Sequence, residues 1–270
     1  MGKRLAAVCL ALTFLLGSRA TFALDKTQVW DLYREGESAF RQGTELFDTD
    51  PLKARELLEK AAVSFETVQR EGDIENGNLF YNLGNTYFRL ADLGKAILNY
   101  RKAERFIPDD INLQQNLNYA RTRCADKIEP MPQTQAFRTV FFWHYDLSGS
   151  VRAWLFALFF AMLWCFASLY LLLKRSWLRH VVLCCAVVSL SLGCSIAVQA
   201  YHQSRIVSGV VLENAVVGRK GDSTTFEPTF KDPLHAGTEF SLVEERNGWL
   251  HIELADGRRC WIPKTAAGIV

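Results

Sequence analysis

The most reactive side chains in this 270-residue sequence are its seven cysteines, two of which are adjacent. Cys184 and Cys185 lie in an apolar run, within about two helical turns of Arg179 and His180. A thiolate near a cation can carry out thiol–disulfide exchange, so this pair is the candidate for a membrane redox enzyme. Adjacent cysteines in an apolar helix can also be merely small, lipid-compatible residues, and no second pair accompanies them.

Other chemistry has little support. No two cysteines have C-x-x-C spacing, and His144 has no second histidine or cysteine at ligand spacing, which argues against a metal site. No glycine-rich phosphate loop or Ser–His–acid arrangement is evident, so we expect a non-catalytic chain without a cofactor. Cys124 and Cys260 could pair if both are exported. The net charge of +2, without a basic stripe, argues against a nucleic-acid partner.

Two apolar runs organise the chain. Residues 153–173 and 181–200 contain no charged side chain, and each run of about 20 residues can cross a bilayer as a helix. The segment between them, KRSWLRH, carries three cations and no acid. We therefore predict a membrane hairpin with helices at 151–173 and 181–202 and a cytoplasmic turn at 174–180. Buried core helices are the alternative.

The N-terminus carries the features of an export signal. Lys3 and Arg4 precede an apolar stretch, and Thr21-Phe22-Ala23 offers small residues at the positions that a signal peptidase reads. We predict a signal peptide at 1–23 with cleavage after Ala23. An uncleaved anchor helix is the alternative, and both place the following segment outside the cytoplasm.

Residues 24–127 show helical periodicity with almost no proline. We predict helices at 30–42 and 52–70, a helix pair within 78–108, and a closing helix at 111–123. Small and aromatic residues alternate along the helix pair at positions that resemble the tetratricopeptide repeat: Phe80, Leu83, Gly84, Tyr87, Ala96, Tyr100, Ala103 and Pro108. The resemblance implies an all-α helical array.

The same resemblance implies a concave groove that binds a protein segment. The residues that match groove positions are Asn78, Tyr81, Asn85, Phe88, Arg89, Gln115, Asn116 and Tyr119. Asn85 and Asn116 match two positions that hold a C-terminal carboxylate in some repeat proteins. The cations that complete such a clamp are not apparent, and a solvated groove wall is the alternative.

Residues 128–150 lead from this array to the first apolar run. Pro130 and Pro132 end the helical pattern. The stretch 139–147 is rich in aromatic residues, so we predict an interfacial helix there. His144 would place its ring at the level of the lipid headgroups.

Residues 203–270 change to an alternating pattern. We predict strands at residues 209–212, 215–219, 239–244, 249–254 and 259–262. The pairs Asn247-Gly248 and Asp256-Gly257 predict hairpin turns between the last three of these strands. Gly237, Gly248-Trp249, Asp256-Gly257 and Trp261-Ile262 resemble a bacterial SH3-like barrel, although Cys260 replaces the usual glycine. Trp249 and Trp261 are candidates for an aromatic binding platform, with packing as the alternative.

The order of these parts is more specific than any one of them. With YNLGNTYFRLADLGKAILNYRKA at 81–103 and NLNYAR at 116–121, the chain resembles BatE-type proteins of bacterial aerotolerance operons. The resemblance implies a multidomain membrane protein, a non-catalytic inner-membrane scaffold with both end domains in the periplasm. Its partners would be sibling proteins with von Willebrand-type domains, in a system for envelope stress. A cell-wall sensor that binds peptidoglycan through the barrel is the alternative.

Overall fold

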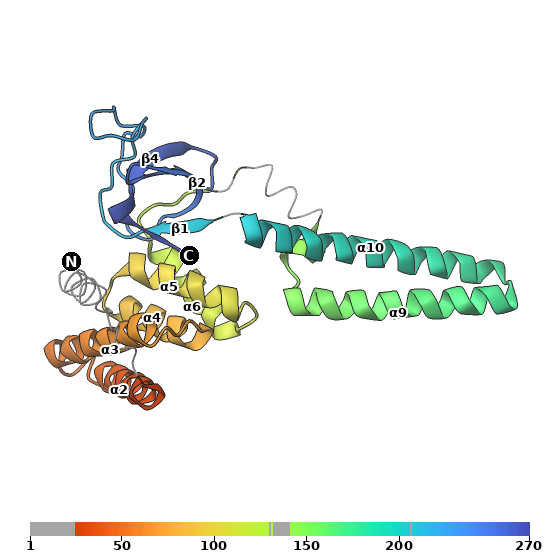
Figure 1. The fold of residues 1–270 in the computed structure, drawn as a ribbon, viewed down its shortest axis with the longest axis horizontal. Helices are drawn as coiled ribbons and strands as arrows, with labels where there is room; N and C mark the ends of the chain where they lie inside the picture. The colour runs from red at the N-terminus through yellow and green to blue at the C-terminus, as the bar shows by residue number, and fades with distance from the viewer. Residues whose placement is uncertain (1–24, 130, 132–140, 206) are drawn as a thin grey trace, which may run out of the picture.

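The computed structural model describes residues 25–129, 131, 141–205 and 207–270, which form a helical array, a long helix hairpin and a small sheet (Figure 1). The signal peptide predicted at 1–23 lies outside the described residues, as do the two prolines and residues 139–140 of the segment before the hairpin.

The array consists of antiparallel helices that follow one another along the chain. They are α2 (Lys26–Glu45), α3 (Pro51–Glu71), α4 (Gly77–Arg89), α5 (Leu93–Phe106) and α6 (Ile111–Arg123). Four of them begin at a polar cap whose side chain accepts a backbone N–H of the first turn: Asp50, Asn76, Asp92 and Asp110. The predicted helices are confirmed, with α6 at its predicted bounds and α2 longer at both ends.

Glycines allow aromatic rings to contact helix backbones in the core of the array. A Cβ atom at Gly84 would lie 2.4 Å from the ring of Tyr100, and one at Gly36 would lie 2.7 Å from Phe65. Phe65, Phe80 and Tyr100 are fully buried. The close approach between α4 and α5 therefore depends on the small residue in the pattern Leu83-Gly84.

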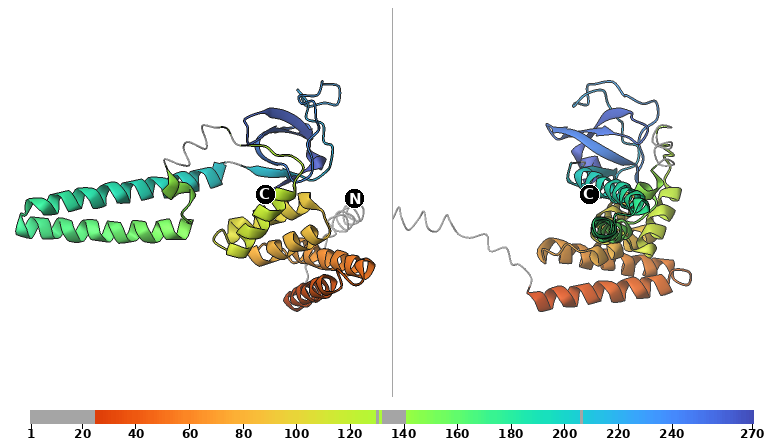
Figure 2. Two further views of the ribbon diagram at one scale, coloured as in Figure 1. Left: turned by 180° about the vertical axis from the view of Figure 1, so that it is seen from behind. Right: turned by 90° about the vertical axis from the view of Figure 1, so that its right-hand side faces the viewer.

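The hairpin consists of α9 (Gly149–Leu173) and α10 (Ser176–Arg205), which lie side by side (Figures 1 and 2). Both are long and apolar enough to cross a membrane, and their most apolar windows are 0% and 22% buried within the protein. The core helix of a soluble protein would be mostly buried. The turn predicted at 174–180 is wrong in length, because only Lys174 and Arg175 interrupt the helices and Leu178 is already buried.

The aromatic segment before the hairpin forms less helix than predicted. Among its described residues, only α8 (Phe142–Tyr145) is helical, which amounts to a single turn. Asp146 closes this turn, and Ser148 begins α9 by accepting a hydrogen bond from the Val151 N–H. The backbone N–H of Asp146 therefore ends α8 on the Phe142 carbonyl at 2.7 Å, whereas a polar side chain begins α9.

The C-terminal part is an antiparallel sheet with the order β4-β3-β2-β1-β5. Its strands are β1 (Ser208–Val211), β2 (Glu239–Arg246), β3 (Trp249–Glu253), β4 (Arg259–Pro263) and β5 (Ala267–Ile269). Asn247 and Gly248 have positive φ angles of 53° and 79°, as the predicted hairpin turn requires. The strand predicted at 215–219 is wrong, because this segment makes only isolated bridges to residues 228, 234 and 261.

The array and the sheet lie at the same end of the hairpin and pack against each other (Figures 1 and 2). Helix α5 contacts β1 and β5. A Cβ atom at Gly94 would lie 2.8 Å from the Leu212 backbone, and one at Gly268 would lie 2.4 Å from Leu98. Gly94 therefore lets α5 contact the backbone that follows β1, and Gly268 leaves room on β5 for the Leu98 side chain.

Candidate functional site

Helices α4 and α6 carry the side chains predicted to line a groove. Asn78, Arg89, Gln115 and Tyr119 are exposed, while Tyr81, Asn85, Phe88 and Asn116 are half-buried. The structure therefore divides the predicted set into an accessible group and a group that is held inside the array.

Most of the half-buried group forms a hydrogen-bonded cluster with Tyr100. Asn116 Nδ2 donates to Tyr81 Oη at 3.1 Å and to Asn85 Oδ1 at 2.9 Å. Tyr100 Oη donates to the same Asn85 oxygen at 2.8 Å. Burial raises the pKa of Tyr100, so its hydroxyl stays protonated as a donor. We call Tyr81, Asn85, Tyr100 and Asn116 the amide cluster; it joins α4, α5 and α6.

The amide cluster does not favour capture of a carboxylate. Both N–H hydrogens of the Asn116 side chain are already donated within the cluster, and the Asn85 oxygen accepts two hydrogen bonds. A bound carboxylate would have to displace these contacts. The two asparagines therefore fit a role in fixing the helices better than a role as ligand donors.

Aromatic and basic groups lie beside the cluster. The rings of Phe88 and Tyr119 are 5.6 Å apart, and Tyr119 is 55% exposed. The Arg89 guanidinium lies 5.4 Å from the centre of the Phe47 ring, which is also exposed. The accessible surface thus combines two aromatic side chains with a cation, a composition that suits protein contacts.

The sequence did not indicate Tyr33 and Asn82, whose side chains form a further hydrogen bond between α2 and α4, beside the amide cluster. Asn82 Nδ2 donates to Tyr33 Oη at 2.9 Å. Burial and the neighbouring Glu37 raise the pKa of Tyr33. Asn82 lies four residues after Asn78 and three before Asn85, so helical spacing could have revealed it. Tyr33 gives no such signal, because it lies 49 positions before Asn82 and on a different helix.

The aromatic platform predicted on the sheet is not formed as expected. Trp261 is only 6% exposed, and its ring stacks on His251 with ring centres 4.8 Å apart. Arg246 lies 4.9 Å from the same ring, and the Arg219 N–H donates to the Trp261 carbonyl at 2.8 Å. Packing therefore accounts for Trp261, and Trp249 is the half-buried member of the pair.

The cysteines form no pair among the described residues. Cys124 and Cys260 are free thiols and belong to different hydrophobic cores, so the suggested disulfide is wrong. Burial raises the pKa of Cys260 to about 12 and also raises that of Cys124, which leaves both thiols protonated. Cys184 is exposed while Cys185 is buried. In the part of the chain that the structure describes, no group of acidic, histidine or cysteine side chains could hold a metal ion.

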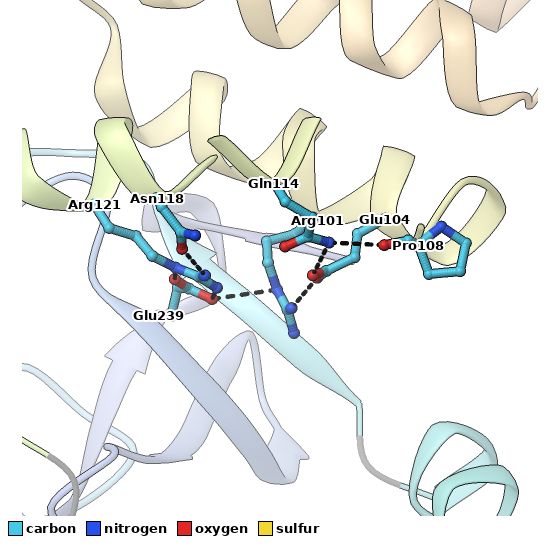
Figure 3. Close-up of polar contacts among 7 residues, drawn as sticks. All are labelled: Arg101, Glu104, Pro108, Gln114, Asn118, Arg121 and Glu239. Atoms are coloured by element: carbon cyan, nitrogen blue, oxygen red, sulfur yellow. Dashed lines mark hydrogen bonds and ion pairs between the residues drawn. The ribbon is translucent and has the colours of Figure 1, made fainter. Parts of the chain in front are cut away.

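A charged junction links the array to the sheet, and Figure 3 shows half of it. Arg121 donates to both oxygens of Glu239, from Nε at 2.6 Å and from Nη2 at 3.0 Å. Arg101 Nε lies 3.2 Å from the same carboxylate and also pairs with Glu104. One acid of the sheet thus holds arginines from α5 and α6, in a geometry typical of strong ion pairs.

The other half of the junction centres on Asp126, just after α6. Its carboxylate accepts the His235 backbone N–H at 2.8 Å and the Thr238 hydroxyl at 2.6 Å, and it lies 2.8 Å from His235 Nδ1. Burial acts against ionisation, but hydrogen bonds from Thr238 and His235 lower the pKa of Asp126 overall. The ionised carboxylate thereby fixes the loop before β2 on the array.

Comparison with protein-family models gives no match, and comparison with curated proteins also gives none.

Proposed function

We propose that this chain is a non-catalytic scaffold of the bacterial inner membrane, with its helical array and its sheet both in the periplasm. The observation that carries the proposal is the position of both parts at one end of a hairpin that is apolar enough for a membrane (Figure 1). The basic residues Lys174 and Arg175 lie at the opposite end, which favours a cytoplasmic turn. The scaffold would therefore present one folded body on one side.

We propose that the array is a tetratricopeptide-like domain and that the sheet is a bacterial SH3-like domain. The alternation of antiparallel helices, with Gly84 against Tyr100, supports the first assignment. The five short antiparallel strands around a small core support the second. With the order of parts, these features support a subunit of a Bat-type aerotolerance system.

The partner-binding surface of this scaffold is the exposed side of α4 and α6. The sheet contacts α5 and, through Arg121, Cys124 and Asp126, the end of α6. The side chains of Arg89 and Tyr119 are exposed, so they can meet a partner without opening the array. The partner we propose is a sibling membrane protein with a von Willebrand-type domain.

Cross-linking in intact cells followed by mild detergent extraction tests this function. The double variant Arg89→Glu and Tyr119→Ala should lose a cross-linked partner with a von Willebrand-type domain, while the amide cluster stays intact. The variant Arg123→Glu makes the same charge change at an exposed position near the end of α6 and should keep the partner. If both variants keep the same partners as the unaltered chain, the surface on α4 and α6 is not the binding site.

A further inference from the structure

Arg152 is buried at the end of the hairpin next to the array and sheet. Only 4% of this side chain is exposed, although it lies in the first turn of an apolar helix. Its guanidinium donates to Ser195 Oγ at 2.8 Å, to Gln199 Oε1, and to His144 Nδ1 at 3.2 Å. These residues, which we call the Arg152 cluster, join α8, α9 and α10.

The described partners of Arg152 leave its positive charge without an ion pair. An arginine can only donate hydrogen bonds, so His144 Nδ1 must accept, and this nitrogen carries no proton. Ser195 and Gln199 are neutral, and the Arg152 Nε atom is buried without a partner among the described residues. A buried cation in this state is costly unless an anion compensates it.

An apolar groove of about 480 Å³ runs beside the cluster, between α8 and α10. Its walls include Trp143, Leu190, Cys194 and Val198, and its polar residues include His144 and Ser195. Leu190 is 69% exposed, so the groove is open to whatever surrounds the hairpin. His144 and Ser195 belong to both the groove and the cluster, so the cation lies one hydrogen bond behind the groove.

We propose that this groove binds an anionic phospholipid of the leaflet nearest the array and the sheet, with an acyl chain along α10 and the phosphate over the Arg152 cluster. The inference rests on the proposed function only in requiring the hairpin to lie in a membrane. Lipid must then cover the exposed apolar wall, and the Arg152 cation, which has no ion pair among the residues that the structure describes, selects a negative headgroup. Charge interactions are strong in such a low-dielectric site, so the phosphate does not need to touch the guanidinium.

Native mass spectrometry of the full chain, released from nanodiscs with equal phosphatidylglycerol and phosphatidylethanolamine, tests the inference. The unaltered chain should retain phosphatidylglycerol preferentially. Arg152→Gln should reduce this preference by about tenfold, which corresponds to about 1.4 kcal/mol. Arg179→Gln, at the other end of the hairpin, should leave it unchanged. Val198→Trp fills the groove without altering the cluster, and it should reduce retention of both lipids.

Three results would overturn the inference. Equal retention of both lipids by the unaltered chain would remove the role of charge, and an unchanged preference in Arg152→Gln together with unchanged lipid retention in Val198→Trp would place the lipid elsewhere. Cross-linking of the exposed Cys194 to another protein, with no lipid retained, would identify a helix as the occupant. Alkaline extraction separates this failure from that of the proposed function: a chain that stays in the membrane but lacks the preference refutes only the lipid site.

Discussion

The amide cluster and the charged junction use polar side chains in opposite ways. The amide cluster is neutral, lies within the array and has exposed side chains beside it, such as Arg89 and Tyr119. The junction is charged and lies between two parts of the chain, where Glu239 and Asp126 are each held by several donors. The junction therefore fixes the position of the sheet relative to the array, whereas the surface beside the amide cluster is available to a partner.

The largest effect should come from a change that forces the junction apart. Gly237 has a φ angle of 93°, and a Cβ atom there would lie 2.5 Å from Cys124 Sγ. Gly237→Ala should therefore lower the free energy of unfolding by about 3 kcal/mol, through backbone strain and a clash. Denaturant titration of the purified chain measures this loss.

The matched control is Gly248→Ala. Gly248 has a similar φ angle of 79°, but nothing lies within 4 Å of a Cβ atom at this position. The unfolding free energy of this variant should fall by only about 1 kcal/mol, because only the backbone conformation is strained. Equal losses in the two variants would show that contact with Cys124 does not matter to stability.

Removing one charge from the junction should have a smaller effect. Glu239→Gln keeps the shape of the side chain but leaves Arg101 and Arg121 without their shared carboxylate. We expect a loss of about 2 kcal/mol in unfolding free energy, since these groups are only partly exposed to solvent. Glu213→Gln, at an exposed position, should change nothing measurable. If Glu239→Gln leaves the unfolding free energy unchanged, the ion pairs do not hold the two parts together.

Acid should weaken the junction through Asp126. The folded structure lowers the pKa of this carboxylate. Its full contribution to stability is therefore present above the pKa of the unfolded chain, near 3.8, and is lost as the pH falls through the lower pKa of the folded chain. Asp126→Asn should cost about 1 kcal/mol at pH 7 and should reduce the loss of stability below pH ~4. Thermal unfolding across this pH range is the measurement, and an unaltered acid dependence in the variant would contradict the assignment.

The smallest effect on stability should come from the proposed binding surface. Tyr119 is more than half exposed, so Tyr119→Ala should change the unfolding free energy by less than about 0.5 kcal/mol. Asn116→Ala, which removes the two hydrogen bonds donated to Tyr81 and Asn85, should cost about 1 kcal/mol. If Tyr119→Ala is the more damaging variant, the division between accessible and internal groove residues is wrong.

Local patterns allowed the helices and most strands to be predicted from the sequence. The spacing of Leu83, Gly84 and Tyr87 reflects one helix face, and Asn247-Gly248 determines its turn without help from distant residues. Strand β5 was missed because Ala267-Gly268-Ile269 is too short and too small in its side chains to show alternation.

Contacts between distant parts could not be predicted in the same way. Glu239 meets Arg121 across 118 positions, and Arg152 meets Ser195 across 43, so no local pattern relates them. The burial of Trp261 likewise depends on a separate loop, in which the Arg219 N–H bonds to its carbonyl. The sequence therefore indicated which residues were available for a site, while the packing of the parts decided which of them remained accessible.

The central claim is that the array and the sheet form one body on the outer side of a membrane. Labelling of single cysteines with a membrane-impermeant maleimide, in cells whose inner membrane is intact, tests it directly in a chain whose native cysteines are replaced by alanine. The variants Tyr119→Cys in the array and Glu213→Cys in the sheet part should both be labelled once the outer membrane is permeabilised. Trp177→Cys, near the basic turn, should be labelled only after the inner membrane is opened. Labelling of Tyr119→Cys without Glu213→Cys in cells with an intact inner membrane would contradict the account.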